Sequence, residues 1–222
     1  MAGPVWGEDS ADDEAIIAAN LVGVLRGILA AASQRPMPTL GAAQQWHRDI
    51  YRGASSPPRP NYLGAFRGSS DPDLVDYEVV LGNPTTGRVL ASGIPAAQVA
   101  AQLAVFEQAL QAAVGKLDAV IAAGAGPADN PQLLSVVELA AVAHGEWVRI
   151  HPFANGNGRI ARTWANWVAV RYGLPPFVRI KPRPDGLMYG RAAHMSMGAP
   201  PVNGPDHSLT VQVFLDLLRQ RP

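Results

Sequence analysis

Twelve residues decide how this chain folds: HPFANGNGRIAR, residues 151–162. A histidine ends an apolar, helix-like run, a short loop of Gly and Asn follows, and a second helix begins that carries two arginines. Glycines have no Cβ, so they let the loop turn tightly and approach a ligand closely. Free N–H groups at the start of a helix bind anions, and arginines at positions i and i+3 share one face. The stretch therefore predicts chemistry on a phosphate ester, with His151 as general base.

Composition narrows the class of protein. The chain has 222 residues, 48% of them apolar, a formal net charge of zero and no cysteine. The apolar content is ample for a core, and the zero charge gives no reason to expect a nucleic acid or a membrane surface as partner. Neither a signal peptide nor an apolar run of about eighteen residues is evident. We therefore expect a cytoplasmic protein, or one delivered to another cell, and the wealth of Ala, Gly and Pro suggests a bacterial source.

The apolar periodicity predicts a mainly α-helical fold with one small β-hairpin. Ser10 with Asp13 is expected to cap the first helix, and Asn130 to cap the fourth. The hairpin strands are expected at residues 77–81 and 88–91, joined by the Gly- and Pro-containing residues 82–87. The expected helices cover residues 10–33, 41–51, 95–123, 130–149, 158–172, 186–195 and 208–219.

The twelve residues resemble the signature of the Fic family, His-Pro-Phe-x-(Asp/Glu)-Gly-Asn-Gly-Arg-x-x-Arg. Eight fixed positions match: His151, Pro152, Phe153, Gly156, Asn157, Gly158, Arg159 and Arg162. The resemblance covers roughly Leu63 to Leu218, and it implies a Fic-like helical bundle with a β-hairpin flap. We divide the chain into an N-terminal arm and helical extension, residues 1–60, and a Fic domain, residues 61–222.

Fic proteins typically transfer AMP from ATP to a Ser, Thr or Tyr hydroxyl of a target protein. The resemblance implies that His151 deprotonates that hydroxyl and that Arg159 and Arg162 bind the β- and γ-phosphates. The loop residues would hold the phosphates largely through backbone amides; these are Gly156, Asn157 and Gly158. The resemblance thus implies a protein adenylyltransferase with ATP as substrate.

Two further assignments come from the resemblance. The flap, here Val79, Val80 and Leu81, is expected to clamp a target segment by main-chain pairing, as in β-augmentation. Tyr189 lies where the family often supplies an aromatic ring to the adenine pocket, although an ordinary core tyrosine fits that position as well.

Asn155 is the one departure from the signature. The family's acidic residue there holds the Mg²⁺ that bridges the nucleotide phosphates, whereas an amide oxygen carries no charge. Because Mg²⁺ prefers carboxylates and phosphates, we expect weakened Mg²⁺ binding, or metal held mostly by the nucleotide. Two alternatives stay open: a different nucleotide or phosphate-linked donor, or a weakly active nucleotide-binding module.

A built-in inhibitory carboxylate is a further hypothesis. Many Fic proteins carry Ser/Thr-x-x-x-Glu-Gly/Asn, whose glutamate pairs with the second motif arginine, here Arg162. Ser10 and Glu14 match in part, since Ala15 follows. The alternative is an acidic first helical turn that merely favours the helix dipole. The expected partners are thus a target protein and either an antitoxin-like inhibitor or further copies of the chain, without nucleic acid or membrane.

Overall fold

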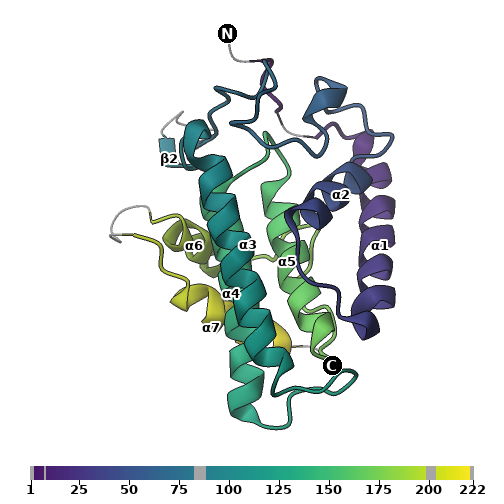
Figure 1. Cartoon of the computed structure of the whole chain (residues 1–222). Helices are drawn as coiled ribbons and strands as arrows, with labels where there is room; N and C mark the ends of the chain where they lie inside the picture. Colours follow the sequence, from purple (N-terminus) through teal and green to yellow (C-terminus); the bar gives the residue numbers. More distant parts are fainter. Residues whose placement is uncertain (1–2, 8, 83–88, 199–203, 221–222) are drawn as a thin grey trace.

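The computed structural model describes residues 3–7, 9–82, 89–198 and 204–220 (Figure 1). Within these residues the fold consists of seven α-helices and one two-stranded sheet, which confirms the mainly α-helical prediction. Short 3₁₀ turns, η1 (Ala32–Gln34) and η2 (Pro60–Tyr62), follow α1 and α2. The helices are α1 (Asp13–Ala31), α2 (Leu40–Ile50), α3 (Ala96–Asp118), α4 (Asn130–Ile150), α5 (Asn157–Arg171), α6 (Leu187–Ser196) and α7 (Ser208–Arg219).

Helix α5 forms the centre of the bundle. It lies between α4 on one side and α1 with α2 on the other, while α3, α6 and α7 pack on α4 (Figure 1). The rings of Trp147 on α4 and Trp164 on α5 are buried with their centroids 6.0 Å apart. Because α1 and α2 share one hydrophobic core with α5, the division at residue 60 stays a prediction.

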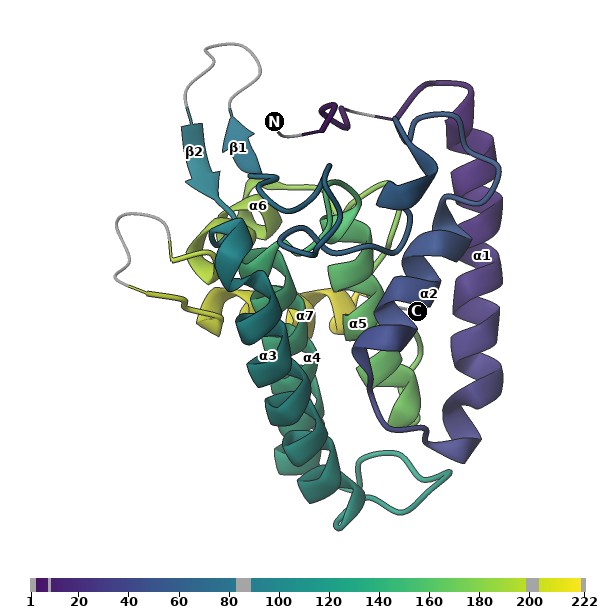
Figure 2. The same ribbon diagram turned by 45° about the horizontal axis from the view of Figure 1, so that its top comes forward.

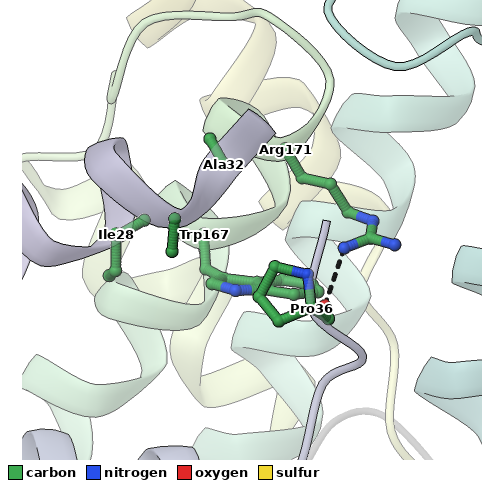
Figure 3. A pocket seen from close by; sticks show the side chains of 6 residues that line it. Ile28, Ala32, Pro36, Trp167 and Arg171 are labelled. Atoms are coloured by element: carbon green, nitrogen blue, oxygen red, sulfur yellow. Dashed lines mark hydrogen bonds between the residues drawn. The ribbon is translucent and has the colours of Figure 1, made fainter. Parts of the chain in front are cut away.

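The end of α1 packs on the end of α5 (Figure 3). Ile28, Pro36 and Trp167 line a cavity of about 10 Å³ there, which is too small for more than a water molecule. Arg171 closes it by donating a hydrogen bond of 2.7 Å to the Pro36 carbonyl. In the described residues α1 with η1 is long and apolar enough to cross a membrane, which the sequence analysis did not expect. Its side chains Ile17, Leu21, Val24 and Ile28 nevertheless pack into the core.

Both predicted helix caps differ in detail from the structure. Asp129, not Asn130, caps α4, because its carboxylate accepts a 2.8 Å hydrogen bond from the Gln132 N–H. The Ser10 hydroxyl does accept from the Asp13 N–H at 3.3 Å. The Asp13 carboxylate, however, accepts from the N–H groups of Ser55 and Ser56 instead of Ser10. This contact fixes the start of α1 to the loop that follows α2.

The hairpin consists of β1 (Val80–Gly82) and β2 (Val89–Ser92), paired antiparallel with Val80 opposite Ser92. The predicted turn at residues 82–87 falls almost wholly outside the described residues. Tyr77, predicted as the first strand residue, instead packs in the core, and its hydroxyl accepts a hydrogen bond from the backbone N–H of Trp6. The hairpin stands at the end of the bundle where the N-terminal residues before α1 lie (Figure 2).

Candidate active site

His151 directly follows α4 and has a left-handed backbone, with φ of 53°. Its Nδ1 lies 2.9 Å from the Val148 carbonyl oxygen. A carbonyl only accepts, so Nδ1 carries the proton and the lone pair of Nε2 is left free. Burial lowers the pKa of His151 to about 4, and the Arg67 guanidinium acts in the same direction. The imidazole is therefore neutral near pH 7 and can accept a proton.

The loop after His151 is closed by the Asn157 side chain. Asn157 Oδ1 accepts from the Phe153 N–H at 2.9 Å, and Asn157 Nδ2 donates to the Phe153 carbonyl at 2.7 Å. The amide is thus committed to the loop, which leaves only the backbone N–H of Asn157 for a phosphate. The Phe153 ring is fully buried and anchors the loop in the core.

His47 on α2 supports the same loop, and sequence reasoning missed it. Its ring stacks on Phe153 with centroids 4.0 Å apart. The Gly64 N–H donates to Nδ1 at 3.0 Å, so Nε2 carries the proton and donates to the Asn155 carbonyl at 3.1 Å. Burial lowers the pKa of His47 to about 3. His47 is therefore a neutral side chain that connects α2 to the loop by a hydrogen bond and by ring stacking.

Two glycines fit the start of α5 closely against its neighbours. Gly156 has φ of 78°, and a Cβ there would lie 2.8 Å from the Tyr51 hydroxyl. A Cβ on Gly158 would lie 3.1 Å from Nη1 of Arg162. Among the described residues the N–H groups of Asn157 and Gly158 have no hydrogen-bond partner. The first turn of α5 thus offers free N–H groups beside a guanidinium, which is a site for an anion.

The two motif arginines are held differently. Arg159 is paired with the Asp9 carboxylate and donates to the Tyr51 hydroxyl. Arg162 is nearly buried, donating from Nε to the Ile180 carbonyl at 2.9 Å and from Nη1 to the Tyr189 hydroxyl at 3.1 Å. Its other three N–H groups have no partner among the described residues and lie beneath Gly158.

Tyr189 is a buried tyrosine whose hydroxyl links two helices. It accepts from Arg162 and lies 2.8 Å from Nε2 of His144. Burial lowers the pKa of His144 to about 3, so the ring is neutral and shares a hydrogen bond with the Tyr189 hydroxyl. The hydroxyl therefore positions Arg162, and a contact between Tyr189 and adenine remains a prediction.

The N-terminal arm, which we define as residues 3–7 and 9, contacts the motif loop and Arg159. Trp6 is buried against His47 and Tyr51, with ring centroids 5.7 and 4.7 Å away. The Gly7 carbonyl accepts a hydrogen bond from the Asn155 side-chain amide. Asp9 pairs with Arg159 and lies 3.6 Å from Nζ of Lys181. The arm therefore reaches Arg159 with a carboxylate where the resemblance places a phosphate.

Glu14 does not occupy the inhibitory position that the sequence suggested. Its carboxylate lies 3.6 Å from Nζ of Lys181 and is mostly exposed. No contact between Glu14 and Arg162 occurs among the described residues, because Glu14 points from the first turn of α1 toward the α5–α6 connection. The carboxylate at the motif is that of Asp9, three residues before the cap of α1.

The loop does not match a protein-held magnesium site. Asn155 is a neutral amide whose oxygen accepts from the Gly156 N–H and whose nitrogen donates to Gly7. The described residues contain no cluster of three His, Cys, Asp or Glu side chains suited to a metal ion. Mg²⁺ stays a prediction here, and no chemical step below depends on it.

The predicted flap residues lie at the start of the hairpin. Val80 is 58% exposed, and the Val79 carbonyl accepts from the Gly93 N–H at 3.0 Å. Leu81 pairs with Ala91 through the backbone, whereas its side chain is outside the described set. The hairpin therefore presents an exposed first strand, and target docking remains a prediction.

A model of the Fic/DOC family matches residues 37–169. The chain belongs to the Fic/DOC family. The match includes the whole motif and begins three residues before α2, within the predicted extension. Among solved structures, the Fic chain resembles a Fic domain containing signaling protein from Bacteroides thetaiotaomicron with a TM-score of 0.61 and 21% identity. That likeness covers 96% of this chain and 69% of the other, and it shows a shared fold.

Curated relatives of this Fic protein are named protein adenylyltransferases. The one from Nematostella vectensis is 43% identical over 61 residues, which is 27% of this chain and 14% of the relative. The one from Caenorhabditis elegans is 48% identical over 42 residues, which is 19% of this chain and 8% of the relative. The matched segment thus spans a small part of these relatives, so their activity comes to this chain only as a proposal.

Proposed function

We propose that this Fic protein is an adenylyltransferase that transfers AMP from ATP to a hydroxyl group of a target protein. The observation that carries the proposal is a neutral His151 with a free Nε2, placed one short loop before the anion site of α5. The names of the curated relatives support the same reaction.

The reaction is written as an in-line displacement. A target hydroxyl gives its proton to Nε2 of His151, and its oxygen forms a bond to the α-phosphorus of ATP. The bond between the α-phosphorus and the bridging oxygen breaks, and pyrophosphate leaves. The free N–H groups of Asn157 and Gly158, with the guanidinium of Arg162, would stabilise the charge on the phosphates. Catalysis then depends mainly on positioning and on fixed positive charge.

The hairpin would supply the target. The predicted flap residues, 79–81, stand at the same end of the bundle as the motif loop, and the Val80 side chain is exposed. An extended target segment pairing with this strand would bring a hydroxyl near His151. Main-chain hydrogen bonds depend little on the side chains of the target. This arrangement would therefore select targets with an extended segment and not targets with a particular sequence.

The inhibitory carboxylate in this proposal is Asp9 in place of Glu14. Arg159 cannot pair fully with Asp9 and with a phosphate at once, since both need the same guanidinium. Asn155 helps to keep the arm against Arg159, because its side-chain amide donates to the Gly7 carbonyl. The acidic residue of the family signature has no N–H at this position and could not make this bond. ATP would therefore bind in competition with the arm.

The test uses ATP labelled either on the α- or on the γ-phosphate, with the purified protein alone and with added cell proteins. The proposal expects the α label to become covalently attached and the γ label to stay in solution. Transfer of the γ label would identify a kinase reaction instead. Binding of ATP without attachment of either label, in both the native form and an Asp9→Asn form, would identify a nucleotide-binding module.

A further inference from the structure

Arg67, in the segment before the hairpin, is a buried cation outside the motif. It is 1% exposed, although a guanidinium is costly to bury without partners. Its backbone N–H also donates to the Pro152 carbonyl at 2.8 Å. Both its main chain and its side chain are therefore attached to the motif loop.

All five N–H donors of the Arg67 guanidinium are used. Nε donates to the His151 carbonyl at 2.6 Å, and Nη2 donates to the Ile150 carbonyl at 2.9 Å and to the Ile94 carbonyl at 2.5 Å. Nη1 donates to the Tyr77 carbonyl at 3.2 Å and to the Glu78 carboxylate at 3.3 Å. A lysine has three donors and no planar fork, so it cannot replace this set.

The five acceptors belong to two parts of the proposed active site. Ile150 and His151 end α4, where carbonyls lack helical partners and the helix dipole favours a cation. Tyr77 and Glu78 precede β1, and Ile94 follows β2. The Arg67 side chain thus connects the backbone of His151, the proposed base, to the segments at both ends of the hairpin.

Gly93 allows this close packing. A Cβ on Gly93 would lie 2.7 Å from Nη2 of Arg67 and 2.8 Å from Cβ of His151. The end of β2 therefore lies directly against both side chains. His151 itself has a left-handed backbone, which a non-glycine residue keeps only when its surroundings hold it there.

We propose that Arg67 is a positioning residue, which fixes the His151 backbone relative to the hairpin so that the imidazole and a docked target hydroxyl meet in one geometry. The inference rests on the proposed transfer reaction. Arg67 touches neither arginine of the phosphate site among its described contacts. Its loss should therefore lower kcat and leave the Kd for ATP unchanged.

Arg35 offers a matched control. It is also a largely buried arginine, and it donates to the main-chain carbonyls of Ile121 and Ala122 at 2.6 and 2.8 Å and to the Asp118 carboxylate at 3.4 Å. Its partners lie at the end of α3 and directly after it, and none of them belongs to the motif. Arg35→Lys and Arg67→Lys should thus reduce Tm similarly, because each keeps the charge and loses donors.

The experiment compares Arg67→Lys, Arg35→Lys and the native chain for kcat, Kd for ATP, Tm and hydrogen exchange. Arg67→Lys should lower kcat about 10- to 100-fold, the effect of misplacing a reacting group by about an ångström. It should also speed exchange at residues 148–156 and in the hairpin together. Arg35→Lys should do neither. The inference is overturned if kcat falls equally in both variants, or if the motif loop and the hairpin keep their native exchange rates in Arg67→Lys.

Hydrogen exchange separates this inference from the proposed function, because it needs no activity. Faster exchange in both segments of Arg67→Lys, in a protein that transfers no AMP, would support the coupling and refute the reaction. Native exchange in Arg67→Lys, in a protein that transfers AMP, would refute the coupling alone.

Discussion

Replacing Asp9 by Asn should strengthen ATP binding. The change removes a negative charge that is paired with Arg159 and lies 3.6 Å from Lys181, while the side-chain volume stays almost constant. The Asp9 and Arg159 side chains are only 7% and 16% exposed, so solvent weakens their attraction little. The arm then competes less well with phosphate for the same guanidinium.

The magnitude follows from the contact that is lost. A hydrogen bond to a charged group contributes about 1.5–3 kcal/mol, and Asn keeps one neutral acceptor. The free energy that keeps the arm bound to Arg159 should therefore fall by about 1–2 kcal/mol. A shift of that size changes an equilibrium about 5- to 30-fold. If, as proposed, ATP binds only when the arm has left Arg159, its apparent Kd should fall by about the same factor.

Isothermal titration in a His151→Ala background measures this affinity without turnover. Asp12→Asn is the matched control, since Asp12 is exposed, lies three residues further on and makes no side-chain cap bond. The reasoning is refuted if Asp9→Asn leaves the Kd for ATP within twofold of the native value. An equal shift in Asp12→Asn would refute it too, because net charge and not the Arg159 contact would then be the cause.

Three further outcomes are expected. Gly156→Ala should lower Tm by at least about 3 °C, since a left-handed residue costs about 1–2 kcal/mol and the new Cβ also meets Tyr51; Gly124→Ala, at the same φ of 78° with open space, should lower it less, and equal losses would refute the Tyr51 contact. The pKa of His47 is lowered to about 3 in the folded protein, whereas an unfolded histidine titrates near about 6.5. As the pH falls from about 6.5 toward about 3, the unfolded chain therefore takes up a proton that the folded protein does not, and the free energy of unfolding decreases. His47→Gln should flatten this decrease in urea unfolding experiments, and an unchanged slope would contradict the reasoning. Asn155→Asp should make ATP binding more dependent on Mg²⁺ in a titration with and without EDTA, and an unchanged dependence would show that this position does not control the metal.

The sequence predicted the helices and the motif well because both are local signals. Apolar periodicity and the Gly/Pro breaks located the seven described helices, although α3 ends at Asp118, five residues before its predicted end; α7 was predicted with the bounds that the structure has. Gly156 and Gly158 stand where backbone geometry demands glycine, which a sequence pattern can reveal. The family match confirmed the resemblance that rested on these residues.

The supports of the motif could not be predicted, because their partners are main-chain atoms distant in sequence. The Arg67 side chain donates to carbonyls up to 84 positions away, and any residue type offers a carbonyl. His47 likewise bonds to the backbone of Asn155 and Gly64. Asp9 does not fit the family's inhibitory motif, which requires a glutamate four residues after Ser or Thr, and it lies in an irregular segment before α1.

The most direct test of the central claim is the mass of a target protein after incubation with ATP and either the native chain, His151→Ala or His194→Ala. The side chain of His194, on α6, makes no described hydrogen bond, so this variant controls for loss of an imidazole. The account predicts an added AMP with the native and His194→Ala forms, no addition with His151→Ala, and an unchanged Kd for ATP in all three. An AMP adduct formed by His151→Ala at the native rate would contradict the assignment of His151 as the base.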